Sequence, residues 1–527
     1  MLSLQYPDRV TGSPNARRAG QYIRRELERL GYPAEVLPFM MWLRGERVQG
    51  DNIVAILPGE SPQSIALMAH YDGQTTSHQA AEDNASGVGV LLELARVLAG
   101  RPHHRGLILV ASDAEEWGMI GARALTGFLK ARNTVAVISI DYLEQGRAPG
   151  LTMACMGQSD GYTPLWLREL VMEAGRSQGV AIHQPESVAE FVERAVEVSP
   201  EDQGPLLRAG IPALNLETES ADYAATRARY HTTADVFQNF DPASFRGLGA
   251  TMEQAVATLD RLPPVVSGGM TYLRLSHGQY LARDQLSLPL ILALLPIVIA
   301  MLFAGSHLVA ESRTWPATLG GPLAYSIPPW LALLVLYALT AANILKRWEL
   351  YPATPKDPFL YEIPLHVLMP LLLALLVGYA VLRRVRVHLR ALRPDAQQAS
   401  FAQDKQALYV CLCFVCLGSF LLNPFAMWFY LGLFAYAALL LVQPRGFVSR
   451  AYNSLLLLLA ALPLLALLYR FGSEIFLGWR IVWYLVLQAA YGVWSPPAAI
   501  LFLLAVTLWC RLLTISVLGG PGRGSVT

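Results

Sequence analysis

The spacing of apolar residues indicates helices and strands in the first half of the chain. Helical spacing runs from Pro14 to Leu30, with Ser13 as a possible cap, and recurs in Ala85–Leu98 and Trp117–Ala131. Between these stretches lie short strand-like runs, at Asn52–Leu57, Ser64–His70, Gly106–Ser112 and Val135–Asp141. Strands that alternate with helices are typical of a largely parallel sheet covered by helices. We therefore predict an α/β fold here, with a mostly parallel mixed sheet flanked by helices.

The second half of the chain consists of long charge-free runs. The first, Gln285–Ala310, has 26 residues without Asp, Glu, Lys or Arg, and a helix needs about 20 residues to cross the hydrocarbon core of a bilayer. Further runs follow at Thr314–Leu345, Ile363–Leu382, Gln406–Pro444, Ala451–Tyr469 and Ile481–Cys510. Turn-forming residues, Asn423-Pro424 and Ser495-Pro496-Pro497, divide two of them. We predict an all-α polytopic membrane domain of about eight spans.

Charge follows the same division of the chain. A cut after Asp284 leaves 25 basic and 33 acidic residues before it, and 16 basic and 7 acidic residues after it. We predict a soluble domain over residues 1–262, a linker over 263–285, a membrane domain over 286–517 and a flexible tail over 518–527. The composition excludes a disordered, collagen-like or nucleic-acid-binding chain. The expected partner is therefore a lipid bilayer, with no nucleic acid.

The distribution of basic residues predicts an orientation in the membrane. The basic segment Arg383–Lys405 follows the third span and is expected in the cytoplasm by the positive-inside rule, which places residues 1–284 outside. The chain starts without the basic and apolar regions of a signal peptide, so we expect an exporting span upstream, with a cytoplasmic first domain as the alternative. Only four lysines accompany 37 arginines, which suggests a GC-rich bacterial coding sequence. The predicted location is a bacterial inner membrane with the first domain in the periplasm.

Three polar residues near the first strand-like runs are candidate metal ligands or their supports. Functional residues of parallel sheets collect beyond the carboxyl ends of strands. His70 ends one such strand, and Asp72 could accept a hydrogen bond that fixes the imidazole tautomer. Alone, this pair is more typical of a structural histidine. Asp83 stands at the start of the helix Ala85–Leu98, where it could equally be an N-cap.

Four more candidates follow later strands and loops. Glu115 and Glu116 come directly after the strand that ends at Ser112, although adjacent acids usually belong to a solvated face. Asp141 ends the next apolar strand, and His231 lies in a polar loop before the helix Pro242–Leu259. Side chains of adjacent residues diverge, so one glutamate could bind a metal while its neighbour reaches a metal-bound water. All these residues are predicted at one edge of the sheet.

The candidate residues form the ligand set of a two-zinc hydrolase. Two imidazoles and three carboxylates are available, with one glutamate to spare. In a two-metal site a bridging carboxylate, with two further ligands on each ion, leaves positions open for water. The mixture of His and carboxylate suits zinc, with manganese or cobalt as alternatives. We expect two zinc ions (Zn2+).

The motifs, in order, resemble those of a known family. They are His70-x-Asp72, Asp83-Asn84-Ala85-Ser86-Gly87, Glu115-Glu116-Trp117-Gly118, Asp141 and Tyr230-His231-Thr232-x-x-Asp235. Over roughly residues 5–262 the chain resembles the co-catalytic zinc aminopeptidases related to glutamate carboxypeptidase, which implies a zinc exopeptidase-like fold. The membrane half resembles that of the membrane-bound members of the endoplasmic reticulum and the vacuole, which usually carry a span before the peptidase domain. One departure is Glu201-Asp202-Gln203, where the family has Ser-Asp-His on the substrate side of the cleft.

The resemblance implies a role for each candidate residue. Asp83 would bridge both metals, with His70 and Asp141 completing one site. Glu116 and His231 would complete the other site. The remaining two roles are catalytic: Glu115 would be the general base, and Asp72 would orient His70. Residues 1–262 would then form a zinc metallopeptidase domain.

These roles lead to an expected function with two alternatives. We expect a membrane-anchored dinuclear zinc exopeptidase of the aminopeptidase type, which hydrolyses peptides with a metal-bound hydroxide and a glutamate base. Glutaminyl cyclisation on the same scaffold uses one metal, and the complete five-ligand set argues against it. The third hypothesis is a non-enzymatic transporter or scaffold in which the soluble half is a sensor. The sequence leaves the substrate and the oligomeric state open.

Overall fold

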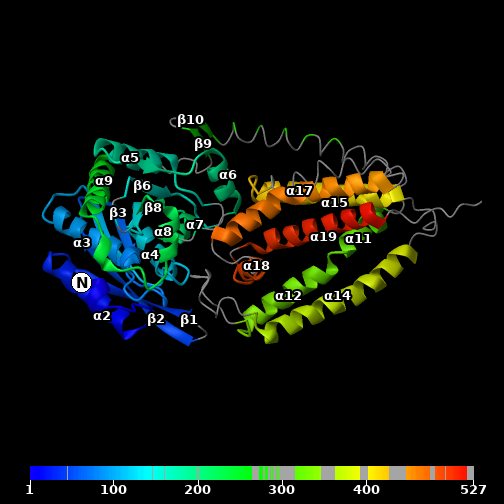
Figure 1. The fold of residues 1–527 in the computed structure, drawn as a ribbon, viewed down its shortest axis with the longest axis horizontal. Helices are drawn as coiled ribbons and strands as arrows, with labels where there is room; N and C mark the ends of the chain where they lie inside the picture. Colours follow the sequence, from blue (N-terminus) through cyan, green and yellow to red (C-terminus); the bar gives the residue numbers. More distant parts are fainter. Residues whose placement is uncertain are drawn as a thin grey trace, which may run out of the picture. The chain divides into compact units, whose positions relative to one another are not determined.

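The computed structural model describes most of the first half of the chain and the main helices of the second (Figure 1). The described residues are 1–263 without 44–45, 145, 147, 159–160, 197–198 and 200, then 272–276, 279–282, 315–345, 363–391, 401–426, 447–474, 481–492 and 494–518, with five single residues between 285 and 299. Contacts divide the chain into two compact units, and the division falls between Arg283 and Asp284. The finer predicted boundaries of the linker and the tail lie largely outside the described residues.

A mixed sheet forms the centre of the first unit, as predicted. Its eight strands have the order β1-β2-β4-β3-β5-β8-β6-β7. Neighbouring strands are parallel from β4 through β3 and β5 to β8, and again between β6 and β7. The pairs β1–β2, β2–β4 and β8–β6 are antiparallel. The strands are β1 (Ala34–Leu43), β2 (Glu46–Leu57), β3 (Ser61–His70), β4 (Arg105–Ser112), β5 (Thr134–Ile140), β6 (Leu151–Ala154), β7 (Ile182–His183) and β8 (Ala213–Thr218).

Helices cover both faces of this sheet. Side chains alternate between the two faces along a strand, so Ile65 and Leu67 of β3 pack on one face while Ala66 and Met68 pack on the other. The first face is covered by α2 (Pro14–Arg29), α3 (Ser86–Leu98), α5 (Leu165–Ser177) and α9 (Pro242–Arg261). The second face is covered by α4 (Ile120–Ala131) and α7 (Gln203–Arg208). Burial on both sides explains the continuous apolar runs of the central strands.

Two predicted helix starts have different outcomes. The side chain of Ser13 accepts a hydrogen bond from the Ala16 backbone N–H, which confirms it as the cap of α2. The helix predicted over Trp117–Ala131 has a later start, because α4 begins at Ile120. Gly118 and Met119 adopt φ values of +102° and +56°, and such left-handed backbone does not belong to a right-handed helix.

The remaining elements of the first unit are short. They are α1 (Leu2–Gln5), a single turn η1 (Ala81–Ala85), α6 (Ser187–Val196), α8 (Tyr223–Arg229), η2 (Phe237–Asn239) and a hairpin of β9 (Tyr272–Ser276) and β10 (Gln279–Ala282). Of these, η1 leads into α3 and α8 precedes the loop of His231. Both therefore position residues of the candidate site.

Helices make up the described part of the second unit. They are α11 (Trp315–Ala324), α12 (Ile327–Ala341), α14 (Leu365–Ala391), α15 (Phe401–Leu422), α17 (Phe447–Glu474), α18 (Ile481–Ala490) and α19 (Pro496–Leu518). Exposed leucines gather along α14, among them Leu365, Leu373 and Leu376. Large exposed apolar surfaces of this kind mark contact with a membrane or a partner.

The described helices include fewer clear membrane spans than the eight predicted. Two segments, Leu365–Leu389 and Pro496–Thr514, are long and apolar enough to cross a bilayer, and a bent pair over Phe447–Tyr469 makes a third when counted as one span. The predicted span Thr314–Leu345 is divided into α11 and α12, and α18 has only 10 residues. The predicted span Gln285–Ala310 and the second half of Gln406–Pro444 lie largely outside the described residues.

Candidate metal centre

Three parallel strands deliver candidate ligands to one edge of the sheet. His70 is the last residue of β3 and pairs with Ser112 at the end of β4. Glu115 and Glu116 lie in the loop that follows β4, and Asp141 comes directly after β5. Because parallel strands end at the same edge, these residues meet although up to 71 positions separate them in the chain.

The first group of potential ligands is His70, Asp83 and Asp141. Their ligand atoms lie within 4.8 Å of one another. His70 Nε2 is 3.1 Å from Asp83 Oδ1 and 3.2 Å from Asp141 Oδ1. Asp83 reaches this position from η1, and its peptide bond to Asn84 is cis.

The second group shares Asp83 with the first. It consists of Asp83, Glu116 and His231, again with ligand atoms within 4.8 Å. His231 Nε2 lies 2.8 Å from Asp83 Oδ2 and 3.1 Å from Glu116 Oε2. Asp83 thus turns one carboxylate oxygen to each group, which is the arrangement of a bridging ligand between two metal ions.

The chemistry of these groups fits divalent cations. The carboxylates are buried close together, and burying charges is costly unless they are paired or bind metals. Burial and the neighbouring Asp83 raise the pKa of Glu116 to about 7, and Glu116 Oε1 has no hydrogen-bond partner among the described residues. Burial lowers the pKa of His231, but the Glu116 and Asp83 carboxylates outweigh it and raise the value to about 10. Metal ions would displace these shared protons.

Glu115 stands beside both groups without joining either. Its side chain is 8% exposed and makes no hydrogen bond or ion pair with the described residues. Burial raises the pKa of Glu115 well above its usual range, against the opposing charge of His70. A carboxyl group of this kind can hold a proton and release it again.

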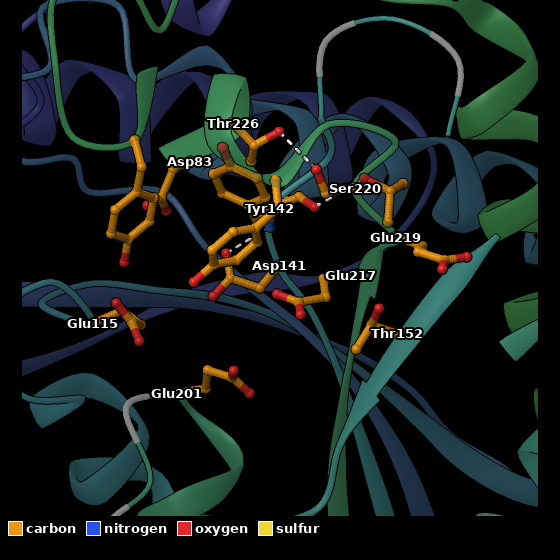
Figure 2. A pocket seen from close by; sticks show the side chains of 13 residues that line it. Asp83, Glu115, Asp141, Tyr142, Thr152, Glu201, Glu217, Glu219, Ser220 and Thr226 are labelled. Atoms are coloured by element: carbon orange, nitrogen blue, oxygen red, sulfur yellow. Dashed lines mark hydrogen bonds between the residues drawn. The ribbon is translucent and has the colours of Figure 1, made fainter. Parts of the chain in front are cut away.

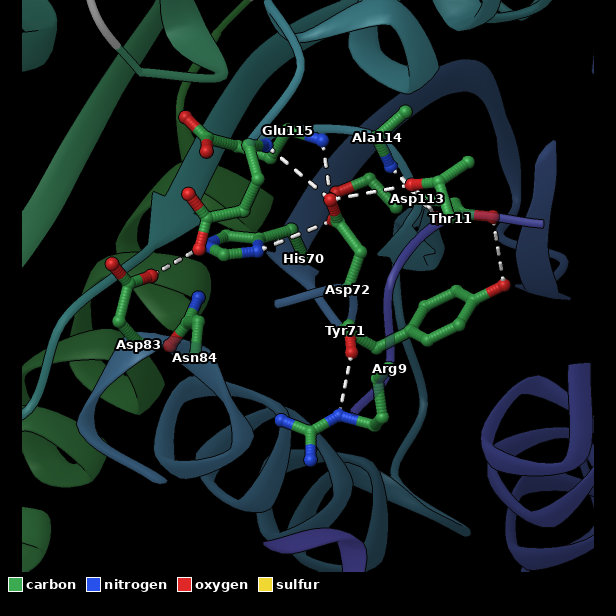
Figure 3. Close-up of polar contacts among 12 residues, drawn as sticks. Arg9, Thr11, His70, Tyr71, Asp72, Asp83, Asn84, Asp113, Ala114 and Glu115 are labelled. Atoms are coloured by element: carbon green, nitrogen blue, oxygen red, sulfur yellow. Dashed lines mark hydrogen bonds and ion pairs between the residues drawn. The ribbon is translucent and has the colours of Figure 1, made fainter. Parts of the chain in front are cut away.

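Asp72 connects the strand of His70 to the loop of Glu115 (Figure 3). Its Oδ1 lies 3.4 Å from His70 Nδ1 and accepts a hydrogen bond from the Glu115 backbone N–H at 3.1 Å. Its Oδ2 accepts from the Glu116 N–H at 3.3 Å. The sequence predicted only the contact with His70, whereas the hydrogen bonds to the glutamate loop are the shorter ones.

Sequence reasoning missed Asp235 and Arg9. Asp235 accepts hydrogen bonds from the backbone N–H groups of Ala81 and Glu82, at 2.8 and 2.6 Å, and so fixes the segment that carries Asp83. Asp235 is the last residue of the motif Tyr230-His231-Thr232-x-x-Asp235, and this motif was the sequence signal that could have identified it. Arg9 is fully buried and donates to the carbonyl oxygens of Tyr71 and Ala80, both at 2.8 Å. No pattern in the sequence singles out Arg9.

A cavity of about 480 Å³ opens from the candidate ligands (Figure 2). Asp83, Glu115 and Asp141 line one part of it. Glu201, Glu217 and Glu219 line the remainder, together with Tyr142, Thr152, Thr218, Ser220, Tyr223, Thr226 and Tyr230. Burial, Asp141 and Asp83 raise the pKa of Glu217 to about 8. Glu201 belongs to the element in which the sequence departs from the Ser-Asp-His pattern, and its side chain lines this cavity.

The two buried groups of histidine and carboxylate side chains suit zinc ions. Residues 52–256 match the model of peptidase family M28, so this part of the chain is similar to that family. The structure places all seven predicted site residues at one sheet edge, while their individual roles remain predictions.

Several curated proteins resemble parts of the chain. The alkaline phosphatase isozyme conversion protein of Escherichia coli is 32% identical over 166 residues, which cover 27% of this chain and 48% of the relative. The vacuolar membrane protease of Schizosaccharomyces pombe is 32% identical over 95 residues, or 18% of this chain and 11% of the relative. Aminopeptidase YwaD of Bacillus subtilis is 41% identical over 74 residues, or 14% and 16%. The matches thus span half or less of these relatives.

Solved structures resemble about half of the chain. A zinc aminopeptidase from Bacillus subtilis aligns with 16% identity and a TM-score of 0.42, covering 49% of this chain and 92% of that one. A glutaminyl cyclase from Porphyromonas gingivalis aligns with 22% identity and a TM-score of 0.41, covering 49% and 94%.

Proposed function

We propose that the chain is a membrane-anchored dinuclear zinc exopeptidase of the aminopeptidase type. The observation that carries this proposal is the Asp83 carboxylate, which faces two buried ligand groups with its two oxygens. His70 and Asp141 would hold one zinc ion with Asp83, and Glu116 and His231 would hold the other. In such a site zinc lowers the pKa of a water molecule and polarises the scissile carbonyl.

Glu115 supplies the acid–base chemistry in this proposal. Its carboxylate accepts a proton from the attacking water and returns it to the leaving amine nitrogen. Burial raises the pKa of Glu115 above its usual range, which favours uptake of a proton by its carboxylate. Asp72 orients His70 and holds the glutamate loop through two backbone N–H groups, so Glu115 stays beside the ligands.

The cavity receives the substrate, which we propose to be the amino-terminal end of a peptide. Its volume of about 480 Å³ is within the usual range for small-ligand sites, roughly 300–1,000 Å³. The acidic lining favours a positively charged amino terminus over a carboxylate. This preference supports aminopeptidase over carboxypeptidase specificity.

The variant Glu115→Gln tests the mechanism. It keeps the size of the side chain but removes the group that holds the proton, so hydrolysis of aminoacyl arylamides should fall by at least about 100-fold. Elemental analysis of the purified full chain should still find two zinc ions in wild type and variant. Glu93→Gln, an exposed position on α3, should keep wild-type activity.

Other outcomes would point elsewhere. Wild-type turnover by Glu115→Gln would remove Glu115 from the mechanism. One bound metal, with cyclisation of glutaminyl peptides in place of hydrolysis, would favour a glutaminyl cyclase. A wild-type chain without metal or turnover would favour a sensor role.

The membrane half supports a location at a bilayer. We propose that it forms about eight spans in a bacterial inner membrane, with the peptidase unit in the periplasm. The apolar helices α14 and α19 and the basic end of α14 support this arrangement.

A further inference from the structure

The part of the cavity beyond the metal ligands contains more carboxyl groups than hydrolysis requires. Asp83 and Asp141 are accounted for as ligands, and Glu115 as the base. Glu201, Glu217 and Glu219 line the same cavity and have no part in the chemistry. None of the described residues that line the cavity is a lysine, an arginine or a histidine.

Two of these three glutamates have no basic side chain paired with their carboxylates among the described residues. Glu219 pairs with His183 at 3.0 Å. The Glu217 side chain, by contrast, makes no hydrogen bond or ion pair with the described residues, and Figure 2 shows it between Asp141 and Thr152. The Glu201 carboxylate accepts one hydrogen bond from the described residues, from the Gln203 side-chain amide at 3.0 Å. Because like charges gathered away from water are unfavourable, a cation that enters this space relieves the repulsion.

Aromatic rings complete the chemistry of the cavity wall. Tyr142, Tyr223 and Tyr230 line it, and the rings of Tyr142 and Tyr230 contact each other edge to face, with centroids 5.6 Å apart. Carboxylates beside aromatic faces bind guanidinium and ammonium groups through ion pairs and cation–π contacts. An aliphatic side chain would gain neither and would leave the carboxylates without partners.

We propose that the cavity selects peptides whose amino-terminal residue is arginine or lysine, with Glu217 as the specificity-determining residue. This inference rests on the proposed aminopeptidase function. The α-ammonium group of the substrate lies near Glu115 and the metal ligands. The side-chain cation extends to Glu217 and Glu201.

The test compares aminoacyl arylamides on the full chain with zinc bound. Wild type should hydrolyse the arginine and lysine substrates with at least a 10-fold higher kcat/KM than the leucine substrate. Glu217→Gln removes the charge at nearly constant size and should lower kcat/KM for the cationic substrates by about 10- to 100-fold, the range expected for a lost charged hydrogen bond. Its kcat/KM for the leucine substrate should stay within about threefold of wild type. Glu93→Gln is the matched control on the surface and should change none of these values.

A binding measurement separates this inference from the proposed function. Titration calorimetry with L-argininamide and L-leucinamide should show tighter binding of the former by wild type, and loss of that difference in Glu217→Gln. A preference for leucine, or an equal loss for all substrates in a folded Glu217→Gln chain, would overturn the inference while the peptidase function stands. Absence of all hydrolysis would overturn the proposed function, and the calorimetry would still test the cavity. If Glu217→Gln fails to fold, Glu201→Gln provides the same comparison.

Discussion

Asp235 holds the backbone that carries the candidate ligand Asp83, and its Oδ2 accepts a hydrogen bond from the Asp83 N–H at 3.4 Å. Besides Ala81 and Glu82 it accepts from the Ser77 hydroxyl at 3.1 Å. Its carboxylate thus accepts hydrogen bonds from backbone N–H groups of η1. This turn directs Asp83 towards both ligand groups. Supporting residues of this kind orient metal ligands, and their loss typically costs about 10- to 100-fold in metal affinity or activity.

We expect Asp235→Asn to weaken zinc binding by about 10- to 100-fold, because the neutral amide is a weaker acceptor and adds two donors that face other N–H groups. Zinc affinity would be measured by competition with a chelator. The control is Asp241→Asn, because Asp241 also accepts a backbone N–H, from Ala243, but caps α9 and asparagine caps helices equally well. Equal zinc affinity in wild type and Asp235→Asn would show that η1 keeps its position without this carboxylate.

The shared location of the candidate ligands could be predicted from sequence because each follows a recognisable strand or motif. His70, Glu116 and Asp141 come directly after apolar runs, so topology alone places them together. Asp235 and Arg9 act through backbone groups more than 60 positions away. Such contacts depend on how loops are arranged in the tertiary structure. The periodicity of a single sequence gives no information about that arrangement.

At the scale of elements, the close approach of α4 to the loop after β4 positions the two glutamates. The site of a Cβ on Gly121 lies 2.1 Å from the Asp113 carbonyl oxygen and 2.6 Å from Asn52 Oδ1. The Gly121 carbonyl also accepts a hydrogen bond from the Asn52 amide at 3.0 Å. Only glycine allows this contact, because no real Cβ atom tolerates backbone at that distance.

Gly121→Ala should therefore move α4 away from the loop and lower both stability and activity. We expect a loss of about 1–3 kcal/mol in the free energy of unfolding, typical of overpacking, and at least a 10-fold lower kcat/KM as Glu115 shifts. Gly127→Ala, on the same helix with nothing within 4 Å of its Cβ, should be neutral or stabilise the chain by up to about 1 kcal/mol. Thermal unfolding and arylamide hydrolysis check both variants, and equal behaviour of the two would contradict a tight contact at Gly121.

The helices and strands could be predicted where their pattern of apolar residues is strong. The central strands are buried on both faces, and their apolar runs mark them clearly. The start of α4 was not predictable, because the left-handed backbone at Met119 is imposed by the loop and not by the residue type. The charge-free run Thr314–Leu345 was predicted as one span, yet hydropathy carries no signal for the break between α11 and α12.

At the scale of the whole molecule, the charge asymmetry of the two units bears on their orientation. The first unit is acidic, whereas the second has an excess of basic residues. Arg383, Arg384, Arg386 and Arg390 lie at the carboxyl-terminal end of α14, directly after its apolar segment. Basic segments next to spans are retained in the cytoplasm, so this end of α14 is expected inside. An odd number of spans up to and including α14 would then place the first unit outside.

Labelling with a membrane-impermeant maleimide tests this arrangement in bacterial spheroplasts. We expect Glu28→Cys, on the exposed surface of α2, to react in intact spheroplasts, because a first unit in the periplasm would be open to the medium. Arg384→Cys, at the basic end of α14, should react only after permeabilisation. The wild-type chain controls for the native cysteines, four of which are buried. Reversed labelling of the two positions would place the first unit in the cytoplasm. The substrates that reach its acidic cavity would then be the amino termini of cytosolic peptides.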